Sequence, residues 1–284
     1  MYPEALKKEC IRLCQKYGLA ENVGKAVDWV DCCEREGAIL FPFIEIIITN
    51  KCNLRCRYCS NLIPHYTSGT HETFEMVKKW IDLICEKATK VFRLKIHGGE
   101  PLLHPDLANV IKYACGKENI LDVRISTNGT LMPSQELLHE MCNKKFRLHI
   151  SDYSASCGIK LEKLTNMLKI AGVNYFVMHG EPWQDLGKIA NNNLNDDELA
   201  TMVYKCNMHK CSSFYNGKLY VCSRASNADR LGLVMATKND YLDFENGFGL
   251  AEYHNFFEKT NFSACKLCKG AIKGVNEILA GEQL

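Results

Sequence analysis

The sequence Phe43-Ile44-Glu45-Ile46-Ile47-Ile48-Thr49 is followed, after two residues, by Cys52-Asn53-Leu54-Arg55-Cys56-Arg57-Tyr58-Cys59. The first stretch is rich in β-branched residues and predicts a buried strand. The second brings three thiols to the end of that strand within eight residues, which is too dense for inert packing. Three thiolates can hold three irons of a cubane cluster and leave the fourth iron open to another ligand. A tetrahedral zinc ion is the alternative, and His65 is the only close candidate for its fourth ligand.

The composition is that of an ordinary globular protein with an excess of cysteine. The chain has 284 residues, 46% hydrophobic and 24% charged, with a net charge of +2. This charge gives no reason to expect nucleic acid or an anionic membrane as partner, and no apolar run approaches the ~20 residues that cross a bilayer. The first residues lack the pattern of a signal peptide, so the 16 cysteines favour metal binding over disulfides. We therefore expect a cytoplasmic protein.

Strand and helix patterns alternate through the first two thirds of the chain. Strands are predicted at 43–49, 91–97, 121–127, 146–151 and 173–178, with helices at 73–88, 106–114, 134–143 and 160–170. This alternation predicts a parallel sheet with right-handed crossovers. No sixth strand can be read after 178, so closure into a barrel is left open. Two helical patterns in residues 3–36 predict a helical cap, and their Cys10, Cys14, Cys32 and Cys33 are expected to be buried apolar thiols.

In such a sheet the chemistry lies beyond the carboxyl ends of the strands. This rule selects Cys52–Cys59, His97–Glu100, Ser126–Asn128, Ser151–Tyr153 and His179–Trp183. Paired glycines at 98 and 99 would let the backbone approach a ligand, and Glu100 could accept hydrogen bonds from an ammonium group. Cys157, in the loop after the fourth strand, lies outside any apolar periodicity and could reach a substrate.

The last third of the chain predicts a second metal site. A polar linker at 191–197 precedes five further cysteines, Cys206, Cys211, Cys222, Cys265 and Cys268. Asn216-Gly217 predicts a two-residue hairpin, and its register would place Cys211 opposite Cys222. Zinc is again the alternative, because the C-x2-C pair suits either metal.

The C-x3-C-x2-C spacing with Tyr58 before the third cysteine resembles the cluster loop of radical S-adenosylmethionine (SAM) enzymes. The resemblance implies an α/β fold with a partial (β/α)6 barrel, a [4Fe-4S] cluster on Cys52, Cys56 and Cys59, and SAM on the open iron. Gly98-Gly99-Glu100-Pro101 resembles the motif that holds the SAM amino group. The other implied SAM-binding residues are Ser126, Asn128, Ser151 and, over the adenine, Tyr58.

The C-terminal part resembles the twitch domain, a shortened SPASM domain that binds one auxiliary four-iron cluster. The family spacing favours Cys206, Cys222, Cys265 and Cys268 as its ligands, whereas the hairpin register speaks for Cys211. Cys211 is then a substitute ligand or a hydrogen donor. The implied division is a helical cap at 1–40, the partial barrel at 41–195 and the auxiliary-cluster domain at 196–284.

The resemblance implies an enzyme that reductively cleaves SAM to a 5′-deoxyadenosyl radical, with electrons from flavodoxin or ferredoxin. The radical would abstract a hydrogen atom from a polar small molecule such as a sugar or sugar nucleotide, because about 40 residues before the barrel leave no room for a peptide-binding domain. Other candidates are a ribosomal-peptide-modifying enzyme, a glycyl-radical activating enzyme, and a non-catalytic zinc or Fe–S protein. The cyclase of molybdenum cofactor synthesis ends in Gly-Gly, unlike Ala280–Leu284 here.

Two outcomes of hydrogen abstraction are left open. Oxidation to a ketone needs an electron acceptor and a base, for which His149, Asp152 and His179 are candidates. Epimerisation needs a thiol that returns a hydrogen atom, for which Cys157 and Cys211 are candidates.

Overall fold

The computed structural model describes residues 8, 11–12, 15 and 23–284, and contains the predicted β/α units. Five strands alternate with four helices along the chain. The strands are β2 (Ile44–Thr49), β3 (Lys90–Gly98), β4 (Ile120–Thr127), β5 (Phe146–Ser151) and β6 (Tyr175–Met178). The helices are α3 (Phe74–Lys87), α4 (Leu107–Cys115), α5 (Gln135–Met141) and α7 (Glu162–Ala171). The strands pair in parallel in chain order, which confirms the predicted sheet.

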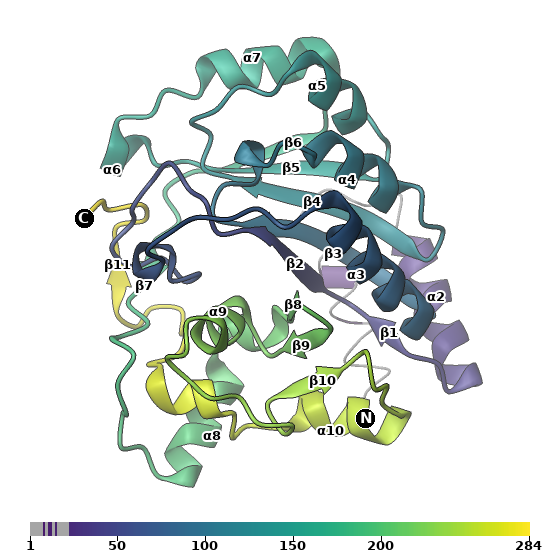
Figure 1. Ribbon diagram of the computed structural model, residues 1–284, viewed down its shortest axis with the longest axis vertical. Helices are drawn as coiled ribbons and strands as arrows, with labels where there is room; N and C mark the ends of the chain where they lie inside the picture. The colour runs from purple at the N-terminus through teal and green to yellow at the C-terminus, as the bar shows by residue number, and fades with distance from the viewer. Residues whose placement is uncertain (1–7, 9–10, 13–14, 16–22) are drawn as a thin grey trace.

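The helices pack on one face of this sheet (Figure 1). Ile46, Ile96 and Ile125 of neighbouring strands are fully buried in one hydrophobic cluster with helical side chains such as Trp80 and Val110. Two of these helices start where short polar side chains cap them. Thr73 accepts a hydrogen bond from the Met76 amide at the start of α3, and Ser134 does the same for α5.

The sheet continues into the C-terminal part of the chain. The hairpin strands β8 (Ser213–Tyr215) and β9 (Lys218–Tyr220) pair with Tyr215 opposite Lys218, as predicted, and β10 (Tyr241–Asp243) pairs with β9. β8 also pairs in parallel with β2, so the sheet order is β10-β9-β8-β2-β3-β4-β5-β6. The sixth parallel strand is therefore β8, on the far side of β2, and in the described residues the edge strands β6 and β10 leave the sheet open. Because the sheet crosses residue 195, the division at 195/196 stays a prediction.

The remaining elements surround this sheet. They are α2 (Val23–Glu36), β1 (Leu40–Phe41), α6 (Ser154–Cys157), β7 (Trp183–Gln184), α8 (Asp196–Lys205), α9 (Ser223–Arg230), α10 (Leu250–Glu258), β11 (Glu277–Ile278) and four 3-10 turns, η2 (Ile63–His65), η3 (Pro101–Leu103), η4 (Asn207–Lys210) and η5 (Ser263–Leu267). β1 pairs with β3 in parallel, and β11 pairs with β7. α2 agrees with the second predicted N-terminal helix, whereas Leu6, Cys10, Leu13 and Cys14 of the first lie outside the described residues. None of the described helices has the length and apolar character to cross a membrane.

Candidate active site

A pocket lies at the carboxyl ends of β2, β3, β4 and β5, where the strand-end rule placed it. All three thiols of the loop after β2 line it, together with the predicted Gly98, Gly99, Ser126, Asn128 and Ser151. Tyr58 and Glu100 are not part of its lining. The structure thus gathers most of the predicted SAM-site residues around one cavity.

Backbone amides stabilise the loop that carries the three cysteines by forming hydrogen bonds within it. The amide of Cys59 donates to the Cys56 carbonyl (3.3 Å), and the Leu54 amide donates to the Cys52 sulfur (3.4 Å). Burial raises the pKa of the Cys52 and Cys56 thiols to about 11 and also raises the pKa of Cys59. Binding of a metal centre would therefore have to release three protons.

The three thiols of the first pocket fit an iron–sulfur cluster better than a single metal ion. Among the described residues, no three His, Cys, Asp or Glu side chains gather as ligands of a single metal ion. In a cubane each thiolate binds a different iron atom, so three thiols spread around one cavity are the donors that such a cluster requires.

Gly98 and Gly99 hold the end of β3 against the backbone that leads into the cysteine loop. A Cβ atom at Gly99 would overlap the Lys51 carbonyl, and one at Gly98 would overlap the Thr49 carbonyl. The close approach allows the Gly99 amide to donate to Thr49 (2.9 Å) and the Glu100 amide to donate to Lys51 (2.8 Å). The glycines were predicted to let the backbone approach a ligand. In the structure they allow close contact with the backbone of Thr49 and Lys51.

The carboxylate of Glu100 forms hydrogen bonds with other residues of the protein. It is fully buried, and its carboxylate accepts hydrogen bonds from the Leu102 amide (3.0 Å), the Thr127 hydroxyl (2.9 Å) and the Asn128 amide (2.8 Å). Burial raises its pKa, and these hydrogen bonds oppose the rise. The side chain that was predicted to receive an ammonium group therefore fixes the end of β4 relative to β3.

Asn128 connects this strand end to the cysteine loop. Its side-chain amide donates to Asn53 Oδ1 (3.0 Å) and lies 3.9 Å from the Cys52 sulfur, while Asn53 also donates to the Thr130 hydroxyl (2.7 Å). The amide of Asn128 is thereby held beside the first thiol.

Asn61 lines the same pocket and was missed in the sequence. Its amide donates to the Gly98 carbonyl (2.6 Å) and to His97 Nε2 (2.8 Å), so His97 presents an acceptor there. Burial lowers the pKa of His97 well below its ordinary value, which keeps the ring neutral. The only signal for Asn61 was its position two residues after Cys59. Tyr153 and Trp183, from the predicted strand ends, complete the wall with rings 5.6 Å apart.

Residues 46–152 match the Radical SAM superfamily. The chain contains a radical SAM domain. The family implies a [4Fe-4S] cluster and SAM, which agrees with the three thiols in the pocket.

Known relatives match this domain over part of their length. GTP 3′,8-cyclase of Campylobacter jejuni subsp. doylei is 30% identical over 172 residues, which cover 57% of this chain and 51% of that protein. GTP 3′,8-cyclase of Alkaliphilus oremlandii is 26% identical over 164 residues, with the same two coverages. The chain thus spans about half the length of the curated relatives it matches. The crystal structure of BtrN in complex with AdoMet and 2-DOIA covers 87% of this chain and 100% of its own, with a TM-score of 0.54 and 15% identity, a likeness of fold.

Residues 281–284 lie against the cysteine loop of the radical SAM domain, a contact that no sequence pattern predicted. Gln283 forms an antiparallel bridge with Cys56, and its side-chain nitrogen lies 3.3 Å from the sulfur of Cys56 and 3.3 Å from that of Cys157. The Cys157 thiol donates to the Gly281 carbonyl (3.2 Å) and is not part of the pocket lining. The predicted hydrogen donor thus contacts residues 281–284 and does not line the pocket.

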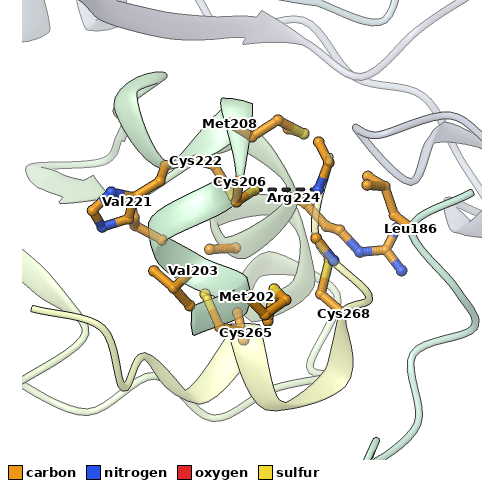
Figure 2. A pocket seen from close by; sticks show the side chains of 15 residues that line it. Leu186, Met202, Val203, Cys206, Met208, Val221, Cys222, Arg224, Cys265 and Cys268 are labelled. Carbon is orange, nitrogen blue, oxygen red and sulfur yellow. Dashed lines mark hydrogen bonds between the residues drawn. The ribbon is translucent and has the colours of Figure 1, made fainter. Parts of the chain in front are cut away.

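A second pocket, outside the matched span, gathers four of the five C-terminal cysteines. Figure 2 shows Cys206, Cys222, Cys265 and Cys268 around it, with Arg224 beside them. Burial raises the pKa of the Cys222, Cys265 and Cys268 thiols.

The expected pairing of Cys211 with Cys222 is wrong. The β8–β9 ladder ends at Ser213 opposite Tyr220, so it does not extend to either cysteine. Cys211 follows the 3-10 turn η4, and Cys222 is the N-cap residue that precedes α9. Cys211 is absent from the lining of the second pocket. The 3-10 turn η4 ends directly before Cys211, so the hairpin register does not continue to this residue.

The candidate bases lie apart from the first pocket. His179 Nδ1 is 2.6 Å from Asp152 Oδ2, and hydrogen bonds from Ser154 and then His179 lower the pKa of Asp152. Asp152, Ser154 and Glu181 line a separate, open cavity near β11. His149 belongs to β5 and is not in the lining of the first pocket.

Proposed function

We propose that this protein is a radical SAM enzyme in which Cys52, Cys56 and Cys59 bind the catalytic cluster. The observation that carries the proposal is the single pocket in which these thiols meet the ends of β3, β4 and β5. When bound, the reduced cluster and SAM supply a 5′-deoxyadenosyl radical. The protein contributes binding, orientation and exclusion of water.

Particular residues would hold SAM in this pocket. The backbone of Gly98 and Gly99 and the polar groups of Ser126, Asn128 and Ser151 line it and offer hydrogen bonds to the polar ends of SAM. Tyr58 lies outside the lining, and we propose that it covers the adenine from the rim. Tyr153 and Trp183 close the wall and keep water from the radical.

The second pocket would hold an auxiliary [4Fe-4S] cluster on Cys206, Cys222, Cys265 and Cys268. Four thiols around one cavity support this ligand set, which is that of a twitch-like domain. Its role would be to exchange an electron with the substrate radical or with a donor such as flavodoxin or ferredoxin. Cys157 and Cys211 both lie outside the two linings, so both stay candidate hydrogen donors.

The substrate would be a polar small molecule such as a sugar or sugar nucleotide, which is oxidised or epimerised. The paired Asp152 and His179 offer a proton acceptor at the neighbouring open cavity. A second candidate substrate is a purine nucleotide, because relatives that match the radical SAM domain are named GTP 3′,8-cyclase.

The test is anaerobic reconstitution followed by iron and sulfide counting and by measurement of 5′-deoxyadenosine and methionine. Changing any one of Cys52, Cys56 or Cys59 to Ala should reduce SAM cleavage to background. Cys142→Ala is the matched control, because Cys142 is an exposed thiol outside both pockets. Undiminished cleavage in the three loop variants would rule the assignment out. Faster 5′-deoxyadenosine formation with GTP than with sugar nucleotides would favour the second substrate.

A further inference from the structure

We propose that Gln283 is a positioning residue of the catalytic cluster: its side-chain amide donates an N–H to the sulfur of Cys56 and raises the reduction potential of the cluster. The inference rests on the proposed function, in which Cys56 is an iron ligand. It concerns a part of the chain outside the matched radical SAM span of residues 46–152.

The backbone places residue 283 beside the cysteine loop. The Arg57 amide donates to the Glu282 carbonyl (2.8 Å), and the Leu284 amide donates to the Arg55 carbonyl (2.9 Å). Glu282 also forms an ion pair with Arg57 (3.2 Å). Figure 1 shows this yellow end of the chain beside α6 and beyond β11. Residues 282–284 thus run antiparallel to the loop, as an added short strand would.

The side chain of Gln283 is oriented by the same loop. Its oxygen accepts a hydrogen bond from the Arg55 amide (2.8 Å), which turns the nitrogen toward the sulfurs of Cys56 and Cys157 and toward the Gly281 carbonyl (2.5 Å). An amide nitrogen has two hydrogens for these three acceptors. With iron bound, Cys56 is a thiolate, and the charged acceptor forms the strongest of the three hydrogen bonds.

The surroundings strengthen this hydrogen bond. Cys56 is only 7% exposed, and a hydrogen bond in such a low-dielectric environment is stronger than one in water. Gly281 packs so closely on Tyr153 that a Cβ atom there would meet the ring at 2.7 Å, and the Cys157 thiol donates to the Gly281 carbonyl. The segment is therefore fixed on two sides of Gln283.

The electronic consequence follows from charge. One-electron reduction adds negative charge that spreads onto the cluster and its thiolates, so an N–H donor stabilises the reduced form more than the oxidised form. Hydrogen bonds to sulfur are among the factors that set the potential of iron–sulfur clusters. Loss of the donor should make the cluster harder to reduce.

The experiment compares midpoint potentials of the full-length, reconstituted protein by EPR-monitored redox titration of the cluster signal that SAM perturbs. Gln283→Leu should shift the midpoint to a more negative value. Gln283→Glu can still accept from the Arg55 amide but lacks the N–H and adds negative charge, so its shift should be larger. Glu282→Gln is the matched control, because it removes the ion pair with Arg57 and leaves the amide near Cys56. It also removes a negative charge, so its midpoint should not become more negative than that of the wild type.

The outcomes separate the two proposals. If neither Gln283 variant has a midpoint more negative than that of the wild type, the role of Gln283 is excluded even though the cluster is present. If Gln283→Leu binds too little iron to titrate, Gln283→Met, which also lacks the N–H and adds no charge, takes its place. A wild-type protein with no iron signal that responds to SAM would contradict the proposed function itself.

Discussion

At the scale of single residues, the second pocket contains a guanidinium group and backbone amides that can stabilise negative charge on its sulfurs. Arg224 lines it, is 8% exposed and donates to the Gly187 carbonyl (2.7 Å). Its guanidinium opposes the rise that burial causes in the pKa of the Cys268 thiol. Backbone amides add further donors, from Gly270 to the Cys268 sulfur (3.4 Å) and from Ala271 to the Cys206 sulfur (3.3 Å). A cluster held by thiolates needs such compensation when it is removed from water.

Cys206 and Cys211 can be distinguished by iron content. In a variant with Cys52, Cys56 and Cys59 all changed to Ala, we expect about four irons per chain at the second pocket. A further Cys206→Ala change should remove most of this iron, whereas Cys211→Ala should retain it, because Cys211 lies outside the pocket lining. Elemental analysis after anaerobic purification measures both. Equal loss in the two variants contradicts the ligand set, and zinc in place of iron identifies the alternative metal.

At the scale of secondary-structure elements, His104 joins the start of α4 to the segment before α3. Its Nδ1 accepts a hydrogen bond from the Asp106 amide (3.1 Å), and Nε2 therefore donates to the Glu72 carbonyl (2.8 Å). The ring is 4% exposed and packs edge-on against His71. Burial lowers the pKa of both histidines, so the folded protein holds them neutral.

This arrangement predicts a loss of stability in mild acid. Below about pH 6.5 the unfolded chain binds protons at these histidines that the folded chain does not, so the free energy of unfolding falls as the pH decreases toward the lowered pKa values. His104→Gln should cost about 1 kcal/mol at pH 7.5, for a lost hydrogen bond, but should make the decrease between pH 7 and 5.5 shallower. Urea unfolding at a series of pH values measures this slope. His139→Gln, an exposed change in α5, should keep the wild-type slope; an unchanged slope in His104→Gln would contradict the assignment.

Elements of the radical SAM domain were predictable because local patterns determine them. The run from Ile44 to Thr49 and the periodic stripe of α3 each carry their own signal, and strand ends then select the pocket. Parts fixed by distant contacts were not predictable. Nothing local in Ser213–Tyr215 indicates a parallel partner in β2, and nothing in Gln283 indicates a position beside Cys56. The family spacing favoured Cys206 over Cys211, as the pocket does, whereas hairpin register alone did not.

At the scale of the whole molecule, one hydrophobic core joins the parallel strands β2 to β6 to the C-terminal hairpin. Trp80 of α3 packs against Phe214 and Tyr215 of β8, with ring centroids 6.2 and 5.2 Å apart. Phe41 of β1 packs against Phe244 and Tyr253. Both parts belong to the same buried cluster, so they are expected to unfold together.

Native-state hydrogen exchange should show this cooperativity. The amides of β8 and β9 should exchange with the same free energy as those of β2 and β3, because they share hydrogen bonds and core. The reference element is α8, whose Leu199, Met202 and Val203 form a separate small cluster. Its amides should exchange at lower urea concentration. Early exchange of β8 and β9, with β2 still protected, would show that the hairpin is an independent unit.

The β2–β8 pairing has a consequence for synthesis of the protein on the ribosome. β2 emerges early, but the strand that covers its open edge is translated only after β3 to β6 and α8. During that interval the nascent chain exposes unpaired backbone groups along a strand that is almost entirely apolar, the kind of edge that recruits other chains. Glu45 faces Ser213 in the final register and interrupts this strand with a carboxylate near Lys95 (3.3 Å). A charge at that position opposes edge-to-edge aggregation until β8 arrives, so replacing Glu45 with an apolar residue should increase the aggregation of a chain released before Ser213 is synthesised.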